Sequence, residues 1–541
     1  MSDPIVFAES LGGSALSRAA RAGELPQWFV PIPKSVDDWR RHARNVIESV
    51  PANWLEALEP AISPNGAAGQ RLRKSAGGKG LVITTGQQPG LFGGPLMTFV
   101  KALSARALAD ELQQTLNIPV APVFWAATDD ADFDEAASIS LAMDGGAREL
   151  TLEQRSPSGT PVTRVPLGPE VEEMAALLRE ACGSAAHAST LDAALEAYRD
   201  GVTIGDSYVT LLRRILEPLE ISVFDVSHAA VAGASRALLG RAAQRAERVA
   251  TAVRNRDAEL TAAGFAPQVD EVSSLAHVFL NEHGTKRRLT LKEAAALELT
   301  GDQWLSSTVL VRPALERSLF PTAAYLGGPG ETAYFAQVTA VADALEIPKP
   351  LVAPRWSMTI LEPRVQRILN ELGVSAESLA DPHTAETQLA RARMEPETAD
   401  ALRGLRDGLQ VQVDRLAAAN HGVVAPTVLD GLRNEMAHRL DRLERRFVSG
   451  VKRRETDLMR QVATARGSLY PHGSRQERKL AFVPFLARYG SPLVERMLAG
   501  AREHARGIVH GDSSSTKHSA DAARASDLES VAGKIDASSV S

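Results

Sequence analysis

The chain has 541 residues, more than one compact core usually serves, so its length predicts roughly two to four domains. Hydrophobic residues make up 44% and charged residues 23%, which is a globular composition. Lys and Arg total 60 against 66 Asp and Glu, a net charge of −6, and this balance argues against a general nucleic-acid binder. The single cysteine, Cys182, excludes an internal disulfide and any multi-cysteine metal site.

The two ends of the chain also restrict its class. The first 17 residues contain Asp3 and Glu9 and lack a basic start followed by an apolar block, which predicts no secretory signal. No window approaches about 18 uninterrupted apolar residues, which predicts no membrane span. Both features favour a cytoplasmic protein that does not bind a membrane, and the near-neutral charge argues against a nucleic-acid partner. Residues 511–541 are rich in Ser, Ala, Asp and Lys without an apolar stripe, which predicts a disordered tail.

Residues 1–75 predict a mostly helical lead-in, and an α/β pattern begins at residue 76. A short β-branched run at 80–85 is followed by a glycine-rich turn, then by apolar residues at helical spacing over 96–116. Residues 120–127 are apolar throughout. This order is a βαβ unit, and a strand that is apolar on both faces predicts a parallel sheet covered by helices.

The α/β pattern continues to about residue 360. It predicts a helix over 204–219, a strand over 221–225, helices within 228–263, a small β insertion around 265–300, strands over 308–312 and 323–326, and a helix over 331–345.

Residues 361–470 predict a helical arm. Its apolar residues are spaced by three and four, which is typical of a coiled coil; they are Leu429, Leu432, Met436, Leu440, Leu443, Phe447 and Val451. A break at 420–426 would let an earlier helix pair with this one as an antiparallel hairpin. A structural hairpin or a dimer contact is the expected role of the arm. Residues 471–510 predict an apolar helical segment that docks on the core.

The first candidate site is the turn at 85–95, where a buried strand meets a helix N-terminus. Ligands of open α/β sheets bind at the carboxyl ends of the strands, and free backbone N–H groups there favour an anion. The turn matches neither the P-loop nor the dinucleotide fingerprint, and a purely structural turn is the alternative. The candidate binding residues are Thr85, Gly86, Gln87, Gln88, Gly90, Phe92, Gly94 and Lys101.

The second candidate is the acidic segment 129–135, at the end of the next strand. Its carboxylates could bind Mg²⁺ beside a phosphate, accept an amine, or act as a base. The alternative is an acidic first turn of a helix, stabilised by the helix dipole.

The third candidate is the turn at 325–335, which repeats the strand–glycine–helix arrangement. Two such turns that face one crevice would hold both ends of a bipartite ligand, and two arginines that follow predicted strands could pair with a carboxylate or phosphate. A surface ion pair is the alternative for each arginine. The candidate binding residues are Tyr325, Gly327, Gly328, Gly330, Glu331, Tyr334, Arg312 and Arg355. The 12 histidines form no H-E-x-x-H motif or close pair, so no metal site is predicted.

In this order, the motifs resemble the cysteine ligase family of bacillithiol biosynthesis. The matching segments are 85–95, Pro122-Val-Phe-Trp-Ala126, Asp129-Asp-Ala-Asp-Phe133, 325–331 with Tyr334, Pro354-Arg355 with Thr359 and Glu362, Gln476-Glu-Arg478 and Arg488-Tyr-Gly490. The resemblance implies an enzyme that joins cysteine to glucosaminyl-malate in the last step of the pathway. It also implies a Rossmann-like core with inserted connecting segments, a coiled-coil arm that forms a homodimer, and ATP or ADP with Mg²⁺ as ligands, without a resident metal centre or prosthetic group.

The segment after the second strand departs from the family pattern in two places. Its start, Thr128-Asp129, differs from the more usual Gly/Ser-Glu. The family usually carries Asp-His-Asp after the second strand, and Ala131 stands where the histidine would be. Either the histidine is dispensable, or Asp130 or Asp132 acts as the base, or the activity of this member is altered. Asp130 and Asp132 are therefore the candidate catalytic residues. Two alternatives remain: a non-catalytic metabolite-binding coiled-coil scaffold, and an ATP-dependent ligase for another amine.

Overall fold

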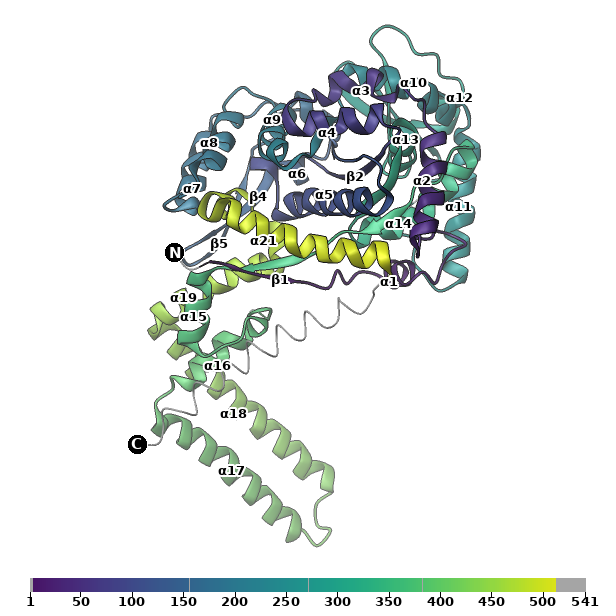
Figure 1. The fold of residues 1–541 in the computed structure, drawn as a ribbon. Coiled ribbons are helices and arrows are strands. Elements are labelled where there is room, and N and C mark those ends of the chain that lie inside the picture. Colours follow the sequence, from purple (N-terminus) through teal and green to yellow (C-terminus); the bar gives the residue numbers. More distant parts are fainter. Residues whose placement is uncertain (1–2, 155, 271, 382, 512–541) are drawn as a thin grey trace.

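The computed structural model describes residues 3–154, 156–270, 272–381 and 383–511 (Figure 1). Apart from Gly511, the predicted tail lies outside these residues. The core is a five-stranded parallel sheet in the order β11-β10-β2-β3-β6. Its strands are β2 (Leu81–Gln87), β3 (Val120–Ala126), β6 (Ser222–Asp225), β10 (Thr322–Gly327) and β11 (Val352–Pro354).

The strand order identifies the sheet as Rossmann-like. From β2 the chain adds β3 and β6 on one side, and then β10 and β11 on the other. The direction of growth therefore reverses between β2 and β10, and ligands of such sheets bind at this switch point, beyond the carboxyl ends of the strands. The predicted α/β fold is confirmed.

Both faces of the sheet are buried, as the continuously apolar strands predict. Leu81, Ile83 and Phe124 belong to one hydrophobic cluster, and Val82 and Trp125 belong to the other. Successive side chains of a strand point to opposite faces, so this division follows from the period of two. The first face is covered by α5 (Leu96–Leu116) and α21 (Val483–His510), and the second by α3 (Trp54–Ile62), α10 (Ala229–Gln244), α11 (Ala246–Ala262) and α14 (Pro329–Leu345).

Two insertions interrupt the parallel sheet. Between β3 and β6 lie α6 (Phe133–Ala137), the hairpin of β4 (Ser138–Met143) and β5 (Gly146–Thr151), α7 (Glu170–Cys182), α8 (Ala188–Ala197) and α9 (Ile204–Leu216). Between β6 and β10, after α10 and α11, lies an antiparallel sheet of β7 (Leu275–Glu282), β8 (Thr285–Thr290) and β9 (Trp304–Ser307). The short helix α12 (Leu291–Ala295) connects β8 to β9, and α13 (Arg312–Leu319) follows β9. The predicted β insertion is confirmed.

The predicted strand over 308–312 is wrong. The strand β9 ends at Ser307, and Arg312 begins α13 instead. Pro313 occupies the first turn of that helix, where its missing N–H costs no hydrogen bond. The Arg312 amide donates to the Thr308 carbonyl at 2.9 Å, which starts the helical turn.

The N-terminal segment contains one strand that the sequence did not indicate. β1 (Ile5–Ala8) pairs antiparallel with β12 (Met358–Leu361), far along the chain. The helices α1 (Ala15–Ala22), α2 (Val36–Glu48), α3 and α4 (Gly66–Gly77) follow.

The arm extends away from the core (Figure 1). Its two long antiparallel helices are α17 (Pro396–Ala418) and α18 (Pro426–Arg454), so the predicted break at 420–426 is confirmed. The helices α15 (Pro363–Leu372), α16 (Thr384–Ala392) and α19 (Thr456–Leu469) connect it to the core, and α20 (Gln476–Lys479) leads into α21. None of the helices in the described part of the chain combines the length and the apolar character that a membrane span requires.

Candidate active site

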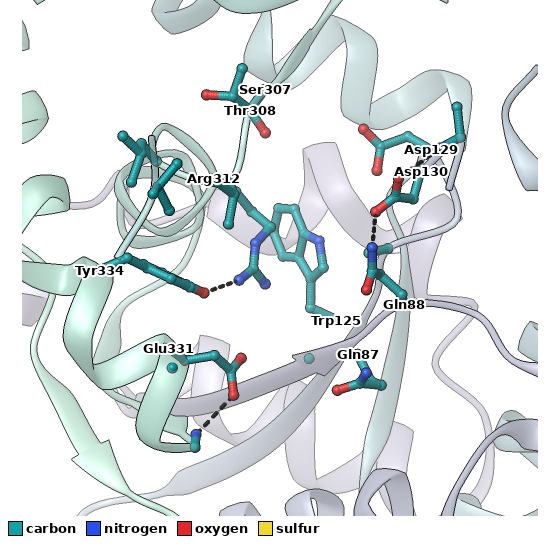
Figure 2. Close-up of a pocket in the computed structure, with 18 of the residues that line it drawn as sticks. Gln87, Gln88, Trp125, Asp129, Asp130, Ser307, Thr308, Arg312, Glu331 and Tyr334 are labelled. Carbon is teal, nitrogen blue, oxygen red and sulfur yellow. Dashed lines mark hydrogen bonds between the residues drawn. The ribbon is translucent and has the colours of Figure 1, made fainter. Parts of the chain in front are cut away.

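A cavity of about 770 Å³ lies at the switch point of the sheet (Figure 2). The turn after β2 contributes Gly86, Gln87 and Gln88 to its lining, and the start of α14 contributes Gly328, Gly330, Glu331 and Tyr334. The two glycine-rich turns are about 240 residues apart in the chain, yet they border one cavity. The predicted shared crevice is therefore present.

A third side of the cavity comes from the second insertion. Alternate residues of β7 and of β8 line it: His277 with Phe279, and Lys286 with Arg288. Sequence reasoning did not nominate these four residues. The available signal was their spacing by two, because alternate side chains of a strand share one face.

A buried lysine joins the two glycine-rich turns. Lys101, on α5, has 3% of its side chain exposed. Its ammonium donates to the Gly86 carbonyl and to Gln87 Oε1, both at 2.9 Å, and pairs with Glu331 at 2.7 Å. Burial lowers the pKa of Lys101, and the Glu331 carboxylate opposes that shift.

Glu331 in turn closes the start of α14. Its carboxylate accepts the Gly328 N–H at 2.8 Å and the Tyr325 hydroxyl. Burial opposes ionisation of Glu331, but Lys101 and the Gly328 amide outweigh it, so the pKa of Glu331 lies below its usual value. Glu331 is therefore ionised, and it already occupies the Gly328 amide that the sequence analysis had offered to a ligand.

The turn after β2 offers fewer free amide groups to an anion than the sequence predicts. The Gly93 amide donates to the Tyr198 hydroxyl at 2.9 Å, and the Leu96 amide, at the start of α5, donates to the Leu480 carbonyl at 2.7 Å. Gly93 and Gly94 have φ values of 84° and 80°, in the region that favours glycine. These glycines shape a buried turn, and the amides of Gly93, Gly94 and Leu96 are bonded within the protein.

Several predicted binding residues lie behind the cavity and not in its lining. The Thr85 hydroxyl donates to the Leu326 carbonyl at 2.9 Å and so ties β2 to β10. The Phe92 ring packs on Tyr198 with their centroids 5.1 Å apart. The other members of this group are Gly90, Gly94, Tyr325 and Gly327.

Arg312 presents a positive charge to the cavity. Its guanidinium donates to the Tyr334 hydroxyl at 2.8 Å (Figure 2) and contacts the Tyr325 hydroxyl at 3.5 Å. Among the described residues, no carboxylate lies within ion-pair distance of Arg312. This arrangement leaves the charge available for an anionic ligand.

Arg355 differs, although it also borders the cavity. It is 1% exposed and forms a two-pronged ion pair with Glu477 of α20, with N···O distances of 2.6 and 3.0 Å. The Ser357 hydroxyl donates to the same carboxylate at 2.9 Å. The charge of Arg355 is thus neutralised inside the protein, which gives this predicted ligand-binding residue a structural role.

The two candidate catalytic carboxylates occupy different places. Asp130 lines the cavity and accepts hydrogen bonds from Gln88 at 2.5 Å and from the amides of Ala131 and Asp132 at 2.7 and 3.1 Å. Asp132 caps α6 through the Glu135 amide at 3.2 Å and lines a smaller hollow next to residues 154 and 156–160. The structure brings Asp130 into the site and leaves Asp132 outside it.

Cys182 and metal ligands play no part in this geometry. Burial raises the pKa of the Cys182 thiol to about 11, so it is a thiol near neutral pH. In the part of the chain that the structure describes, no three His, Cys, Asp or Glu side chains gather closely enough to hold a metal ion.

Comparison with known proteins gives one consistent family. Residues 34–356 match "Bacillithiol biosynthesis BshC, N-terminal Rossmann-like domain", and residues 358–506 match "Bacillithiol biosynthesis BshC, C-terminal coiled-coil domain".

Several relatives whose alignments cover most of this chain carry the name "Putative cysteine ligase BshC". The protein of Solibacter usitatus is 31% identical over 77% of this chain and 82% of its own length, and that of Koribacter versatilis is 30% identical over 80% and 83%. The protein of Staphylococcus carnosus is 26% identical over 76% and 81%. The predicted ligase class agrees with these names. With both domains matched, the chain belongs to the BshC family of bacillithiol biosynthesis.

Proposed function

We propose that this protein is a cysteine ligase that forms an amide between the carboxyl group of cysteine and the amine of glucosaminyl-malate, as the last step of bacillithiol biosynthesis. The names of the relatives support the cysteine ligase, and the acceptor rests on the family resemblance. The observation that carries the proposal is the cavity at the sheet's switch point, where Arg312 faces the interior without a carboxylate partner among the described residues. A malate group carries two carboxylates, and a guanidinium binds such a group with two parallel hydrogen bonds.

Amide formation from a free carboxylate requires activation, and we propose ATP with Mg²⁺ as its source. The ammonium of Lys286 on the cavity wall fits a phosphate chain, and Asp130 offers an oxygen ligand of the type that Mg²⁺ prefers. When bound, ATP would convert the cysteine carboxylate into a reactive acyl group. The protein's own contribution is to hold both substrates together, which turns a bimolecular reaction into a local one. We infer that the reaction takes place in the cytoplasm, where ATP and free cysteine are both available.

The proposal is tested with purified protein, cysteine, glucosaminyl-malate and Mg·ATP, with the thiol product followed by mass spectrometry. The Arg312→Met variant should lower kcat/KM by roughly tenfold to 150-fold, because a hydrogen bond to a charged group contributes about 1.5–3 kcal/mol. Arg367→Met, on the exposed side of α15, is the matched control and should not change the rate. Absence of product from the wild-type protein would contradict the proposal.

Ala131 gives a specific reason to test a non-catalytic scaffold as the second candidate. Ala131 lines the cavity, so a histidine at this position would border the site. We expect Ala131→His to change the ligation rate by less than threefold. A large gain in activity would instead indicate a decayed site and favour the scaffold.

We further propose that the arm forms a homodimer. Apolar side chains remain exposed along its two long helices, including Leu405 and Leu416 at 54% and Leu432 at 41%. A paired coiled coil would bury such a stripe. Light scattering should give twice the chain mass for the wild type and for Glu435→Gln, a charged-residue control on the same arm, and a monomer for Leu416→Glu combined with Leu432→Glu.

A further inference from the structure

Asp129 belongs to the acidic segment 129–135, but it is not one of the two predicted catalytic residues, Asp130 and Asp132. Asp129 follows β3 and lines the cavity beside Trp125. Figure 2 shows its carboxylate directed toward the cavity, whereas the carboxylate of the next residue, Asp130, reaches to Gln88. The two neighbouring aspartates therefore face different surroundings.

Asp130 is a poor candidate for taking a proton. One of its oxygens accepts the Gln88 amide, and the other accepts two backbone amides, of Ala131 and Asp132. To take a proton from a substrate, Asp130 would have to give up one of these internal partners. Asp130 is better suited to shape the loop that follows β3.

Asp129 has surroundings that suit a base. No side chain of the described residues donates a hydrogen bond to its carboxylate. Burial raises its pKa, Asp130 acts in the same direction, and the cations Lys286 of β8 and Arg312 of α13 act against it. A buried carboxylate has lost its normal hydration, so a cationic or hydrogen-bonding partner stabilises its charged form more than it would in water.

Lys286 fixes the position of this group. Its ammonium donates to the backbone carbonyl of Asp129 at 2.5 Å and lies over the Phe279 ring, 4.7 Å from its centroid. The end of β3 is therefore attached to β8 across the cavity wall, which holds Asp129 in place while its carboxylate stays open to the interior.

We propose that Asp129 binds the amine of the acceptor substrate and takes the proton that this amine loses during ligation. The inference rests on the proposed function and adds to it the residue that recognises the amine. In the step, the amine nitrogen bonds to the activated acyl carbon of cysteine, and the phosphate-type leaving group supplied by ATP departs with the electron pair of its C–O bond. One proton moves from nitrogen to the Asp129 carboxylate, which then releases it to solvent.

The test compares Asp129→Asn, which removes the charge and keeps the shape, with Asp129→Glu, which keeps the charge. Asp132→Asn is the matched control, since it lies outside the cavity. We expect Asp129→Asn to lower the kcat of ligation by roughly 100-fold to 10,000-fold, the usual contribution of a general base. Asp129→Glu should stay within about tenfold of the wild type, and Asp132→Asn within about twofold. Thermal unfolding of each variant checks that the fold is kept.

Two further readouts separate the role of Asp129 from other causes. Cysteine-dependent consumption of ATP, measured without acceptor, should be unchanged in Asp129→Asn, because that step does not involve the acceptor amine. In calorimetry, the wild type should bind glucosaminyl-malate at least tenfold more tightly than its N-acetyl derivative, and Asp129→Asn should lose this preference.

Each contrary result has a distinct meaning. Wild-type ligation that Asp129→Asn leaves intact would overturn the inference and spare the proposed function. Equal loss of ligation and of ATP consumption would assign Asp129 to cysteine or nucleotide, and would also overturn it. If the wild type does not ligate, the proposed function fails, and an equal affinity for the amine and its N-acetyl derivative would then overturn the role of Asp129 independently.

Discussion

The buried ion pair between Arg355 and Glu477 allows a sharp test of which arginines serve the ligand and which serve the fold. The two side chains are 1% and 2% exposed, and they connect the end of β11 to α20 near the C-terminus. The substitution Glu477→Gln removes the negative charge and leaves a guanidinium in the protein interior. Loss of one partner of a buried pair typically costs about 3–5 kcal/mol, because the remaining charge is uncompensated.

The same geometry predicts the outcome of removing both charges. In Arg355→Met combined with Glu477→Leu, no charge remains to be desolvated, and apolar side chains of similar size fill the space. The double variant should therefore be less destabilised than the sum of its single variants by at least about 2 kcal/mol.

Urea unfolding followed by tryptophan fluorescence measures these differences, since Trp356 adjoins the pair. The matched control is Glu435→Gln in the pair with Arg439 on the arm, where the two side chains are 63% and 70% exposed. An exposed pair contributes less than about 1 kcal/mol. The reasoning is refuted if Glu477→Gln lowers the unfolding free energy by less than about 1 kcal/mol, or if Arg355→Met raises the KM for the acceptor without lowering stability.

A buried carboxyl group and two helical glycines test the fold in different ways. Burial raises the pKa of Glu316 to about 7, against 4.5 for a free carboxyl, although Arg312 and Thr84 oppose the shift, so the folded protein binds this proton more tightly than the unfolded chain does. Its contribution to stability is full below a pH of about 4.5 and falls by about 3 kcal/mol as the pH rises to about 7. Urea unfolding of the wild type and of Glu316→Gln near pH 5 and pH 8 should show this fall in the wild type only. Equal changes of the unfolding free energy with pH in the two proteins would contradict it. Gly467→Ala would place a Cβ 2.4 Å from the Ala147 nitrogen, so it should destabilise the protein by about 1–3 kcal/mol. Gly408 lies on α17 with open space around it, so Gly408→Ala should stabilise the protein by about 0.5–1 kcal/mol. Thermal unfolding compares these two, and a stable Gly467→Ala variant would show that α19 does not pack closely on β5.

The sequence was sufficient for the parallel sheet and for the position of the cavity. A continuously apolar strand such as 120–126 can only be buried on both faces, and glycine-rich turns mark where such strands end. The carboxyl ends of parallel strands meet at one edge, so the turns after β2 and β10 had to be neighbours if their strands were adjacent. The register shows that they are, with Tyr325 opposite Thr84.

The sequence was insufficient where a contact depends on a distant partner. β1 pairs with β12 across some 350 residues, and no local pattern in four residues indicates that partner. Arg312 and Arg355 are alike in sequence terms, each close to a strand-like run. Only the fold reveals that Glu477 neutralises one of them, while the other meets two tyrosine hydroxyls.

The glycine-rich turns show how a correct location can accompany an incorrect reason. They were expected to offer free amides to an anion, yet Tyr198, Leu480 and Glu331 already accept the amides of Gly93, Leu96 and Gly328. An occupied amide cannot bind a ligand without losing its internal partner, and an unmade buried hydrogen bond costs about 1–3 kcal/mol. We therefore propose that recognition falls mainly to side chains of the cavity lining, which come from the strand ends and the β insertion. The turns border the cavity, and under our proposals the specificity of the site depends on the side chains of Arg312 and Asp129, each of which can be tested by a single substitution.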